Sequence, residues 1–232
     1  IYYNVSMKYH INTILVHEKL KEDCECPLCR IEREVEEQFL NEFLNDAVMD
    51  DGKRTEVGEK GFCAEHYKKL FLRQNKLSLA LQIKTRLEKL KEGEGNPTDT
   101  RTGLKTSNFI KDSAETCVIC NELSTAMMRY YVSFAEMFVA EENFKEELAE
   151  TKGFCLRHYA KLLDYAVYAG AKSKDYIVLL NEIQHENEER ILKELQWFCD
   201  KHDYRNRLLP LGTSENVLQR AYEKLYGKKI TD

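Results

Sequence analysis

The spacing of apolar side chains along the chain predicts a series of helices. Over residues 30–50 apolar positions recur at intervals close to 3.6, which is typical of an amphipathic helix. A polar turn is expected at 50–61, followed by a second helix from about 62 to 91. The pattern then breaks at 92–114, where glycines, a proline and several hydroxyl side chains indicate a linker or long loop.

The helical pattern resumes in the second half of the chain. Residues 121–141 carry one apolar face, and the polar return at 142–153 is expected to form a short helix. Further helices are predicted to open near residue 154 and to cover about 174–203 and 214–226. For the last one, Thr213 is the expected N-cap and Gly227 lies just past its end. No stretch alternates as a strand would, so the predicted fold class is all-α.

Composition agrees with a helical, folded chain. The sequence has 232 residues, of which 43% are hydrophobic, with only 10 glycines and 3 prolines. Its net charge of −5 does not favour binding to nucleic acid or to an anionic membrane. No apolar run approaches the ~20 residues that span a bilayer, and no secretory signal is recognised at the N-terminus. We therefore expect a cytoplasmic protein, in which clustered cysteines indicate metal binding or reactive thiols before disulfides.

Two stretches of the chain are nearly the same. GFCAEHYKKL at 61–70 matches GFCLRHYAKL at 153–162, and each has a C-x2-C motif upstream, CPLC at 26–29 and CVIC at 117–120. The C-x2-C motifs are 91 positions apart, and Cys63 and Cys155 are 92 apart. Such closely matched spacings predict an internal duplication.

Each copy of the motif offers three cysteines and one histidine, a soft ligand set that suits tetrahedral zinc. Four protein ligands leave no open coordination position, so the prediction is two structural zinc ions per chain. Pairing within each copy would give one site from Cys26, Cys29, Cys63 and His66, and another from Cys117, Cys120, Cys155 and His158. Pairing across the copies, with half of each site from either repeat, is also compatible with the spacing.

The cysteine pattern is compatible with roles besides zinc binding. The same thiols would fit ordinary core cysteines, disulfides or a redox switch, and these alternatives stay open. Cys24 is interpreted as a free surface thiol. Cys199 and His202 repeat the Cys-x2-His spacing, but they have no third C-x2-C partner and are interpreted as helix packing. The patch at 197–207 is the one candidate for an enzyme pocket, although capping of the long helix explains it more simply.

These motifs resemble an uncharacterised family of bacterial cytosolic proteins found in Gram-positive anaerobes. The likeness rests on the early CPLC, the later GFCxxH and a DYRN segment near the C-terminal end, and it covers most of the chain. The second C-x2-C departs from the pattern, since CVIC lacks the proline but keeps both ligands. The family has no assigned activity, so the resemblance implies no substrate and no reaction.

The sequence thus predicts two zinc-stapled helical repeats, at 1–92 and 115–172, joined by a linker at 93–114 and followed by a helical segment at 173–232. The expected function is binding, as a scaffold or regulatory protein whose partner is another protein or a ligand of unknown kind. A thiol-based redox or metal sensor is the first alternative. An enzyme with a pocket near 197–207 is the second, and the missing catalytic motifs do not favour it.

Overall fold

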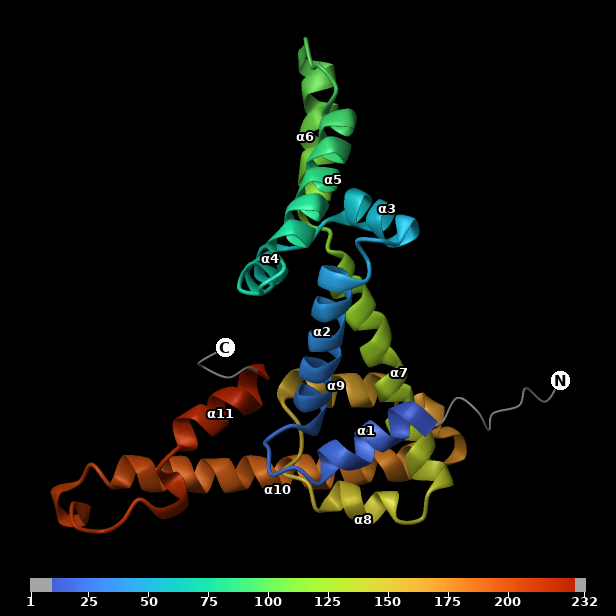
Figure 1. Ribbon diagram of the computed structural model, residues 1–232. Coiled ribbons are helices and arrows are strands. Elements are labelled where there is room, and N and C mark those ends of the chain that lie inside the picture. The colour runs from blue at the N-terminus through green and yellow to red at the C-terminus, as the bar shows by residue number, and fades with distance from the viewer. Residues whose placement is uncertain (1–9, 228–232) are drawn as a thin grey trace. The chain divides into compact units, whose positions relative to one another are not determined.

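The computed structural model describes residues 10–227 and confirms an all-α fold in that part of the chain (Figure 1). Its elements are α-helices joined by turns and three short 3-10 helices, and residues 10–227 contain no strand. The α-helices are α1 (His10–Leu20), α2 (Pro27–Asn45), α3 (Asp51–Lys60), α4 (Ala64–Phe71), α5 (Lys76–Glu94), α6 (Thr100–Ala114), α7 (Val118–Ala140), α8 (Phe144–Ala149), α9 (Leu156–Asp164), α10 (Ser173–Asp200) and α11 (Val217–Tyr226). The 3-10 helices are η2 (Ala166–Lys172), η3 (Tyr204–Asn206) and η4 (Gly212–Ser214).

The helices predicted in the second half of the chain are confirmed by α7, α8, α9, α10 and α11. The last of these ends as expected at Gly227, which adopts the left-handed conformation with φ of 70°. Its start differs from the prediction. The N-cap is Asn216 and not Thr213, because Gly212–Ser214 closes a separate 3-10 turn first.

Two expectations for residues 50–91 are wrong. The polar turn expected at 50–61 is helix α3, whose first turn is capped by the Asp50 side chain accepting from the Lys53 N–H at 3.0 Å. Although most of α3 is polar, Val57 and Gly58 are buried. The single helix expected at 62–91 is divided into α4 and α5, because Asn75 caps a new helix through the Ser78 N–H.

The linker expected at 93–114 contains helix α6. A capping box opens it, in which Asp99 accepts from the Thr102 N–H and Thr102 accepts from the Asp99 N–H. The first N–H groups of a helix have no partner within the helix, and this pairing satisfies two of them. It helps a helix to form in a segment whose glycine and threonine content does not favour one.

The chain divides into two compact units that do not coincide with the predicted repeats. Unit 1 comprises residues 1–32 and 128–232, and unit 2 comprises residues 33–127. The boundaries fall inside α2 and α7. Each unit therefore contains parts of both copies of the sequence motif, and the division at 1–92, 93–114, 115–172 and 173–232 does not describe the compact units.

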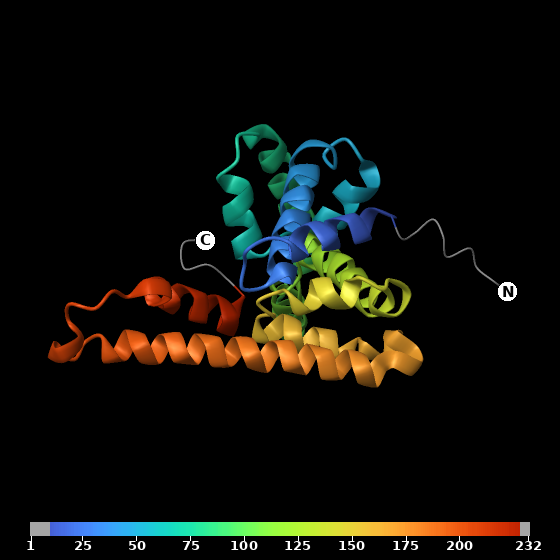
Figure 2. The same cartoon turned by 90° about the horizontal axis from the view of Figure 1, so that it is seen from below.

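The core of unit 1 is aromatic. Phe134 packs edge-on against Phe144 and Phe154, with ring centroids 5.7 and 6.1 Å apart, and Phe138 contacts Tyr176. These rings come from α7, α8, α10 and the segment before α9. The long helix α10 forms one side of the unit, and α11 lies beside it in two views (Figures 1 and 2).

Unit 2 has its own apolar core. Phe43 and Phe62 meet edge-on at 5.7 Å within a buried cluster that also includes Leu40, Leu70 and Leu79. Helix α5 contacts α3, α4 and α6. Within residues 10–227, none of the helices has the length and apolar character that crossing a membrane requires.

Candidate metal centres

The two GFCxxH segments fold in the same way. Gly61 and Gly153 have φ of 64° and 77°, a conformation that side chains disfavour, and they let the chain turn into a helix. Cys63 and Cys155 are the N-caps of α4 and α9. The histidine follows within the first helical turn, where positions three apart share a face. Each segment thus presents one thiol and one imidazole on the same side.

The two C-x2-C turns lead directly into α2 and α7. In the first, the Cys29 N–H donates to the Cys26 carbonyl at 3.2 Å. In the second, the Cys120 N–H points to Cys117 Sγ at 3.5 Å. The second turn has Val118 where the first has proline, and the Val118 N–H donates to the Gly61 carbonyl at 2.9 Å. Proline at the matching position, Pro27, has no N–H to donate.

The structure pairs these half-sites across the two copies. Tetrad 1 consists of Cys26, Cys29, Cys155 and His158, and tetrad 2 consists of Cys63, His66, Cys117 and Cys120. Within each tetrad the ligand atoms all lie within 4.8 Å of one another. The eight residues that the motif predicted are therefore brought together, in the crossed arrangement. Pairing within a copy would have joined Cys26 and Cys29 to Cys63 and His66, and Cys117 and Cys120 to Cys155 and His158. Neither of these two groupings is formed.

Helix lengths explain why pairing within a copy does not occur. Helix α2 has 19 residues and so rises ~28 Å away from the turn that holds Cys29. An extended return could cover that distance, but the return is helix α3, whose 10 residues advance only ~15 Å. The second copy follows the same course, with α7 of 23 residues and a short helical return. Each C-x2-C turn therefore meets the GFCxxH segment of the other copy.

Tetrad 1 lies wholly within unit 1. His158 Nδ1 is 3.4 Å from Cys26 Sγ, 3.3 Å from Cys29 Sγ and 3.4 Å from Cys155 Sγ. The sulfurs of Cys29 and Cys155 are 3.6 Å apart. Cys26, Cys155 and His158 are buried, and Cys29 is half-buried.

Tetrad 2 lies wholly within unit 2 and has nearly the same dimensions. His66 Nδ1 is 3.2 Å from both Cys63 Sγ and Cys117 Sγ and 3.4 Å from Cys120 Sγ. The sulfurs of Cys63 and Cys120 are 3.8 Å apart. Here Cys117 and His66 are buried, whereas Cys63 is half-buried and Cys120 is exposed.

These distances match the edges of a zinc coordination tetrahedron. With Zn–S of about 2.3 Å and Zn–N of about 2.0–2.1 Å, a regular tetrahedron has S–S edges of about 3.8 Å and S–N edges of about 3.6 Å. The three S–N distances of each tetrad, with the Cys29–Cys155 and Cys63–Cys120 distances, lie within a few tenths of an ångström of these values. None of the cysteines in residues 10–227 forms a disulfide. Both tetrads can therefore hold a metal ion.

A carboxylate of α2 faces the Nε2 atom of each histidine, on the side of the ring away from the sulfurs. His66 Nε2 is 3.0 Å from Glu36 Oε1, a contact that orients the ring so that Nδ1 faces the sulfurs. Lys69 Nζ also binds Glu36, at 2.6 Å. In tetrad 1, Glu32 Oε2 is 3.6 Å from His158 Nε2, beyond hydrogen-bonding distance, and Arg157 holds that carboxylate by two contacts. Sequence reasoning missed both carboxylates, although Glu32 and Glu36 lie one helical turn apart on α2.

Without a metal, the surrounding side chains already favour one thiolate in each tetrad, Cys117 in tetrad 2 and Cys155 in tetrad 1, whereas burial and neighbouring thiols raise the pKa of Cys120 and Cys29. Burial raises the pKa of the Cys117 thiol, but the hydrogen bond to His66, backbone hydrogen bonds from Cys120 and Cys63 and the charge of His66 together lower the pKa to about 6. Burial likewise opposes the imidazolium of His66, yet hydrogen bonds to Cys117 and Glu36 raise its pKa to about 10. In tetrad 1, hydrogen bonds from Cys26 and Cys29 hold the pKa of Cys155 far below its usual range. A metal ion would replace the protons of both tetrads.

The end of α11 covers tetrad 1. A Cβ built on Gly227 would lie 2.9 Å from Cys155 Sγ and 3.1 Å from Cys29 Sγ, so only glycine fits here without displacing the sulfurs. This close approach explains why the helix ends in a glycine at this point, beyond the left-handed conformation itself. Among the described residues, no glycine approaches the exposed Cys120 of tetrad 2 in the same way.

The remaining cysteines lie outside both tetrads. Cys24 is not a surface thiol as predicted but is buried, and burial raises its pKa despite a hydrogen bond from Arg30. Cys199 is exposed, and His202 packs against the Phe198 ring at 5.4 Å between centroids. The packing role expected for this pair agrees with that contact.

The polar side chains of the patch at 197–207 form hydrogen bonds and an ion pair around the C-terminal end of α10. Trp197 Nε1 donates to the Pro210 carbonyl at 3.2 Å, and Asn206 Nδ2 donates to the Asp200 carbonyl at 2.9 Å. Arg205 is paired with Asp203 at 2.7 Å. These contacts account for the polar side chains as caps and support the simpler of the two interpretations.

A buried carboxylate next to tetrad 1 gave no signal in the sequence. Glu25, immediately before Cys26, is 3% exposed and faces three cations. Its Oε2 is 2.6 Å from Arg190 Nη2 and 3.5 Å from Lys224 Nζ, and its Oε1 is 3.6 Å from Arg220 Nη1. These cations come from α10 and α11, far along the chain, so only the folded structure reveals the cluster.

Comparison with known proteins supports the expected kinship. The chain is 27% identical over 192 residues to an "Uncharacterized 23.9 kDa protein in xynA 3'region" of Caldicellulosiruptor sp. (strain Rt8B.4), and the match covers 82% of this chain and 87% of that protein. No solved structure matches the chain. The model of a family of unknown function, DUF6062, matches residues 7–232. The chain therefore belongs to the DUF6062 family of unknown function.

Proposed function

We propose that each tetrad binds one zinc ion and that both ions are structural. The observation that carries the proposal is the gathering of two separate Cys3His sets, each with ligand atoms within 4.8 Å of one another and with one S–S distance close to the edge of a zinc tetrahedron. Thiolates with one imidazole favour zinc over harder cations such as magnesium or calcium. Four protein ligands leave no position for water or substrate, so the ion would supply a cross-link and no chemistry. It would join a C-x2-C turn to the start of α9 or α4.

Metal content tests this proposal. Protein purified without a histidine tag or chelator is expected to contain about two zinc ions per chain by elemental analysis. Chelation should then expose thiols and reduce helicity, because metal binding and folding are coupled in small units of this kind. Protein that contains no metal while its thiols all react freely, and that keeps its full helicity, would contradict the proposal.

We further propose that the folded chain acts by binding, as a scaffold or regulatory protein. Support comes from closed metal sites, from polar side chains of 197–207 that serve as caps, and from exposed apolar side chains on α4, α5 and α6. Another protein is the partner class that these surfaces favour. The net charge of −5 does not favour nucleic acid.

A thiol sensor is the second candidate, favoured by the difference in burial between the tetrads. In tetrad 2 the sulfurs of Cys63 and Cys120 are 3.8 Å apart, and Cys120 is exposed. A peroxide could reach them, and two thiolates, one hydrogen peroxide and two protons would give one disulfide and two waters, with release of the zinc ion. Tetrad 1 is covered by Gly227 and would react more slowly.

Peroxide treatment separates this candidate from a purely structural role. In a Cys199→Ser background, which removes the exposed thiol outside the tetrads, a small excess of hydrogen peroxide is expected to release about one zinc ion per chain before the other. Peptide mapping should find the new disulfide among Cys63, Cys117 and Cys120. Release of both ions at the same rate, or resistance of both to peroxide, would contradict a sensor role for tetrad 2.

A further inference from the structure

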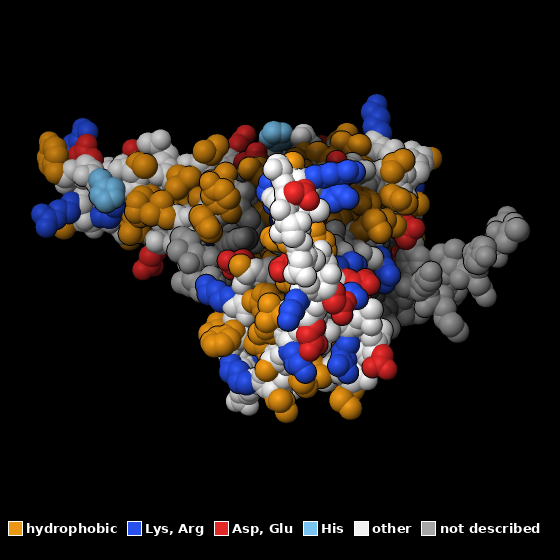
Figure 3. All heavy atoms as spheres, turned by 90° about the horizontal axis from the view of Figure 1, so that it is seen from above, with side chains coloured by type: hydrophobic (Ala, Val, Ile, Leu, Met, Phe, Trp, Pro, Cys, Tyr) orange, Lys and Arg blue, Asp and Glu red, His pale blue; other side chains and the backbone are white. Residues whose placement is uncertain are grey.

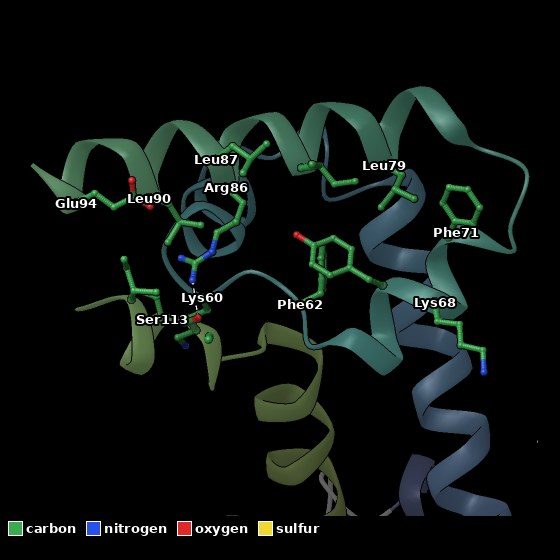
Figure 4. Close-up of a pocket in the computed structure, with 14 residues that line it drawn as sticks. Lys60, Phe62, Lys68, Phe71, Leu79, Arg86, Leu87, Leu90, Glu94 and Ser113 are labelled. Atoms are coloured by element: carbon green, nitrogen blue, oxygen red, sulfur yellow. Dashed lines mark hydrogen bonds between the residues drawn. The ribbon is translucent and has the colours of Figure 1, made fainter. Parts of the chain in front are cut away.

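A groove of about 690 Å³ lies between α4, α5 and α6 in unit 2 (Figure 4). Its floor and walls are mainly apolar, with Phe62, Tyr67, Phe71, Leu79, Ile83 and Leu87 among the lining residues. Several of these side chains are exposed, including Leu87 at 60% and Phe71 at 65%. Apolar side chains also reach the surface between charged ones in the space-filling view (Figure 3). An open apolar groove of this size is a feature of binding sites.

The corresponding pair of helices in unit 1 is covered by a third helix. Because GFCxxH opens both α4 and α9, and a longer helix follows each, the α4–α5 pair corresponds to the α9–α10 pair. In unit 1 helix α11 contacts both α9 and α10. Unit 2 has no helix after α5 that corresponds to α11, since α6 leads instead into the C-x2-C turn, as α1 does in unit 1. The chain itself therefore shows what kind of element fits such a groove.

In each unit a buried cation binds backbone carbonyls just before the two cysteine motifs, and this supports the correspondence of the two units. In unit 1, Lys224 of α11 donates to the carbonyls of Lys152 and Glu25, just before Gly153 and Cys26. In unit 2, Arg86 of α5 donates to the carbonyls of Gly58, Glu59 and Ser113, which precede Gly61 and Cys117. A Cβ on Gly153 would lie 3.5 Å from Lys224 Nζ, and a Cβ on Gly61 would meet the Arg86 side chain. In unit 2 the cation therefore comes from α5 itself, and the position that α11 occupies in unit 1 remains open.

We propose that the α4–α5–α6 groove binds an amphipathic helix of a partner protein, with an acidic side chain where α11 carries Lys224. The groove runs along α5 from Leu79 to Glu94, a length of ~22 Å, which accommodates a helix of the size of α11 at ~15 Å. Arg86 and Lys68 line the groove against the single carboxylate of Glu94, while Lys60, which also lines it, is paired with Glu56 at 2.8 Å. This excess of positive charge selects an acidic residue over a second lysine.

The proposal deepens the binding role proposed above and does not depend on the metal. Its probe is a fluorescein-labelled peptide of residues 213–227, made with the native sequence and with Lys224→Glu. Fluorescence anisotropy with the full chain measures the affinity of each peptide. We expect the Lys224→Glu peptide to bind about tenfold more tightly than the native peptide, because its carboxylate meets Arg86 where the native lysine meets a like charge.

Two leucine variants with matched chemistry locate the site. Leu87→Glu introduces a charge into the groove at an exposed position and is expected to weaken binding of the Lys224→Glu peptide at least about tenfold. Leu192→Glu makes the same change at an exposed position of α10, outside the groove, and should leave binding unchanged. Lys68→Glu should also weaken binding, since Lys68 lines the groove and is exposed.

Three results of the anisotropy experiment would overturn the proposal: neither peptide binds, both bind equally, or binding is insensitive to Leu87→Glu. A small apolar molecule that copurifies with the chain, and that Leu87→Glu expels in native mass spectrometry, would also overturn it by assigning the groove to a different ligand. Because zinc content is measured separately, each of these results leaves the metal proposal standing.

Discussion

Replacing His158 with alanine is expected to release one zinc ion and unfold unit 1, while tetrad 2 keeps its metal. The apparent binding free energy of a structural zinc ion is about 10–16 kcal/mol, comparable to the whole stability of a domain, which is about 5–15 kcal/mol. Loss of one ligand of four should therefore remove most of what holds the unit together. The His66→Ala variant is expected to show the reverse pattern, with tetrad 2 lost and tetrad 1 kept.

Hydrogen exchange with zinc analysis measures this outcome by segment. For His158→Ala, protection should fall in α8, α9, α10 and α11 of unit 1 and persist in α3, α4 and α5 of unit 2. His202→Ala is the matched control, because its ring packs on Phe198 outside both tetrads. The assignment of tetrads to units would be contradicted if His158→Ala removed both metals equally, or if protection were lost mainly in α4 and α5.

Removal of the Glu25 carboxylate is expected to destabilise unit 1 by about 3–5 kcal/mol. This carboxylate is buried among Arg190, Arg220 and Lys224, so Glu25→Ala leaves three cations without their common counter-charge. Burial lowers the pKa of Lys224 and Glu25 opposes that shift, so the variant should also favour loss of the Lys224 proton.

Urea unfolding followed by hydrogen exchange in unit 1 measures the change. Asp23→Ala is the control from the same turn, because Asp23 is 82% exposed and its ion pair with Lys152 is at the surface. It should cost less than about 1 kcal/mol. Equal effects of the two substitutions would show that the buried cluster contributes no more than a surface ion pair.

Local patterns in the sequence predicted those features that local interactions decide. The apolar stripe of residues 174–203 became α10, and the glycine signal at Gly227 became the end of α11, because periodicity and capping act within a few residues. The doubled motif likewise identified the eight residues that gather in the two tetrads. A C-x2-C turn and a Cys-x2-His helix start are each formed by neighbours in the chain.

The features that were not predictable depend on where distant segments meet. The pairing of the half-sites follows from the helical return α3, and the polar composition of residues 50–61 conceals that helix, in which only Val57 and Gly58 are buried. Cys24 was expected at the surface, yet it is buried in the folded chain, because segments distant in sequence cover it. The carboxylates of Glu25, Glu32 and Glu36 were indistinguishable from solvated acidic residues for the same reason.

The pairing of the half-sites across the two copies is the central claim, and zinc analysis of two double variants tests it directly. Cys26→Ser with Cys155→Ser removes two ligands of tetrad 1 alone, so this protein should retain about one zinc ion per chain. Cys26→Ser with Cys63→Ser removes one ligand from each tetrad, so it should retain close to none. Pairing within each copy predicts the opposite result for both proteins, and that reversal would contradict the crossed arrangement.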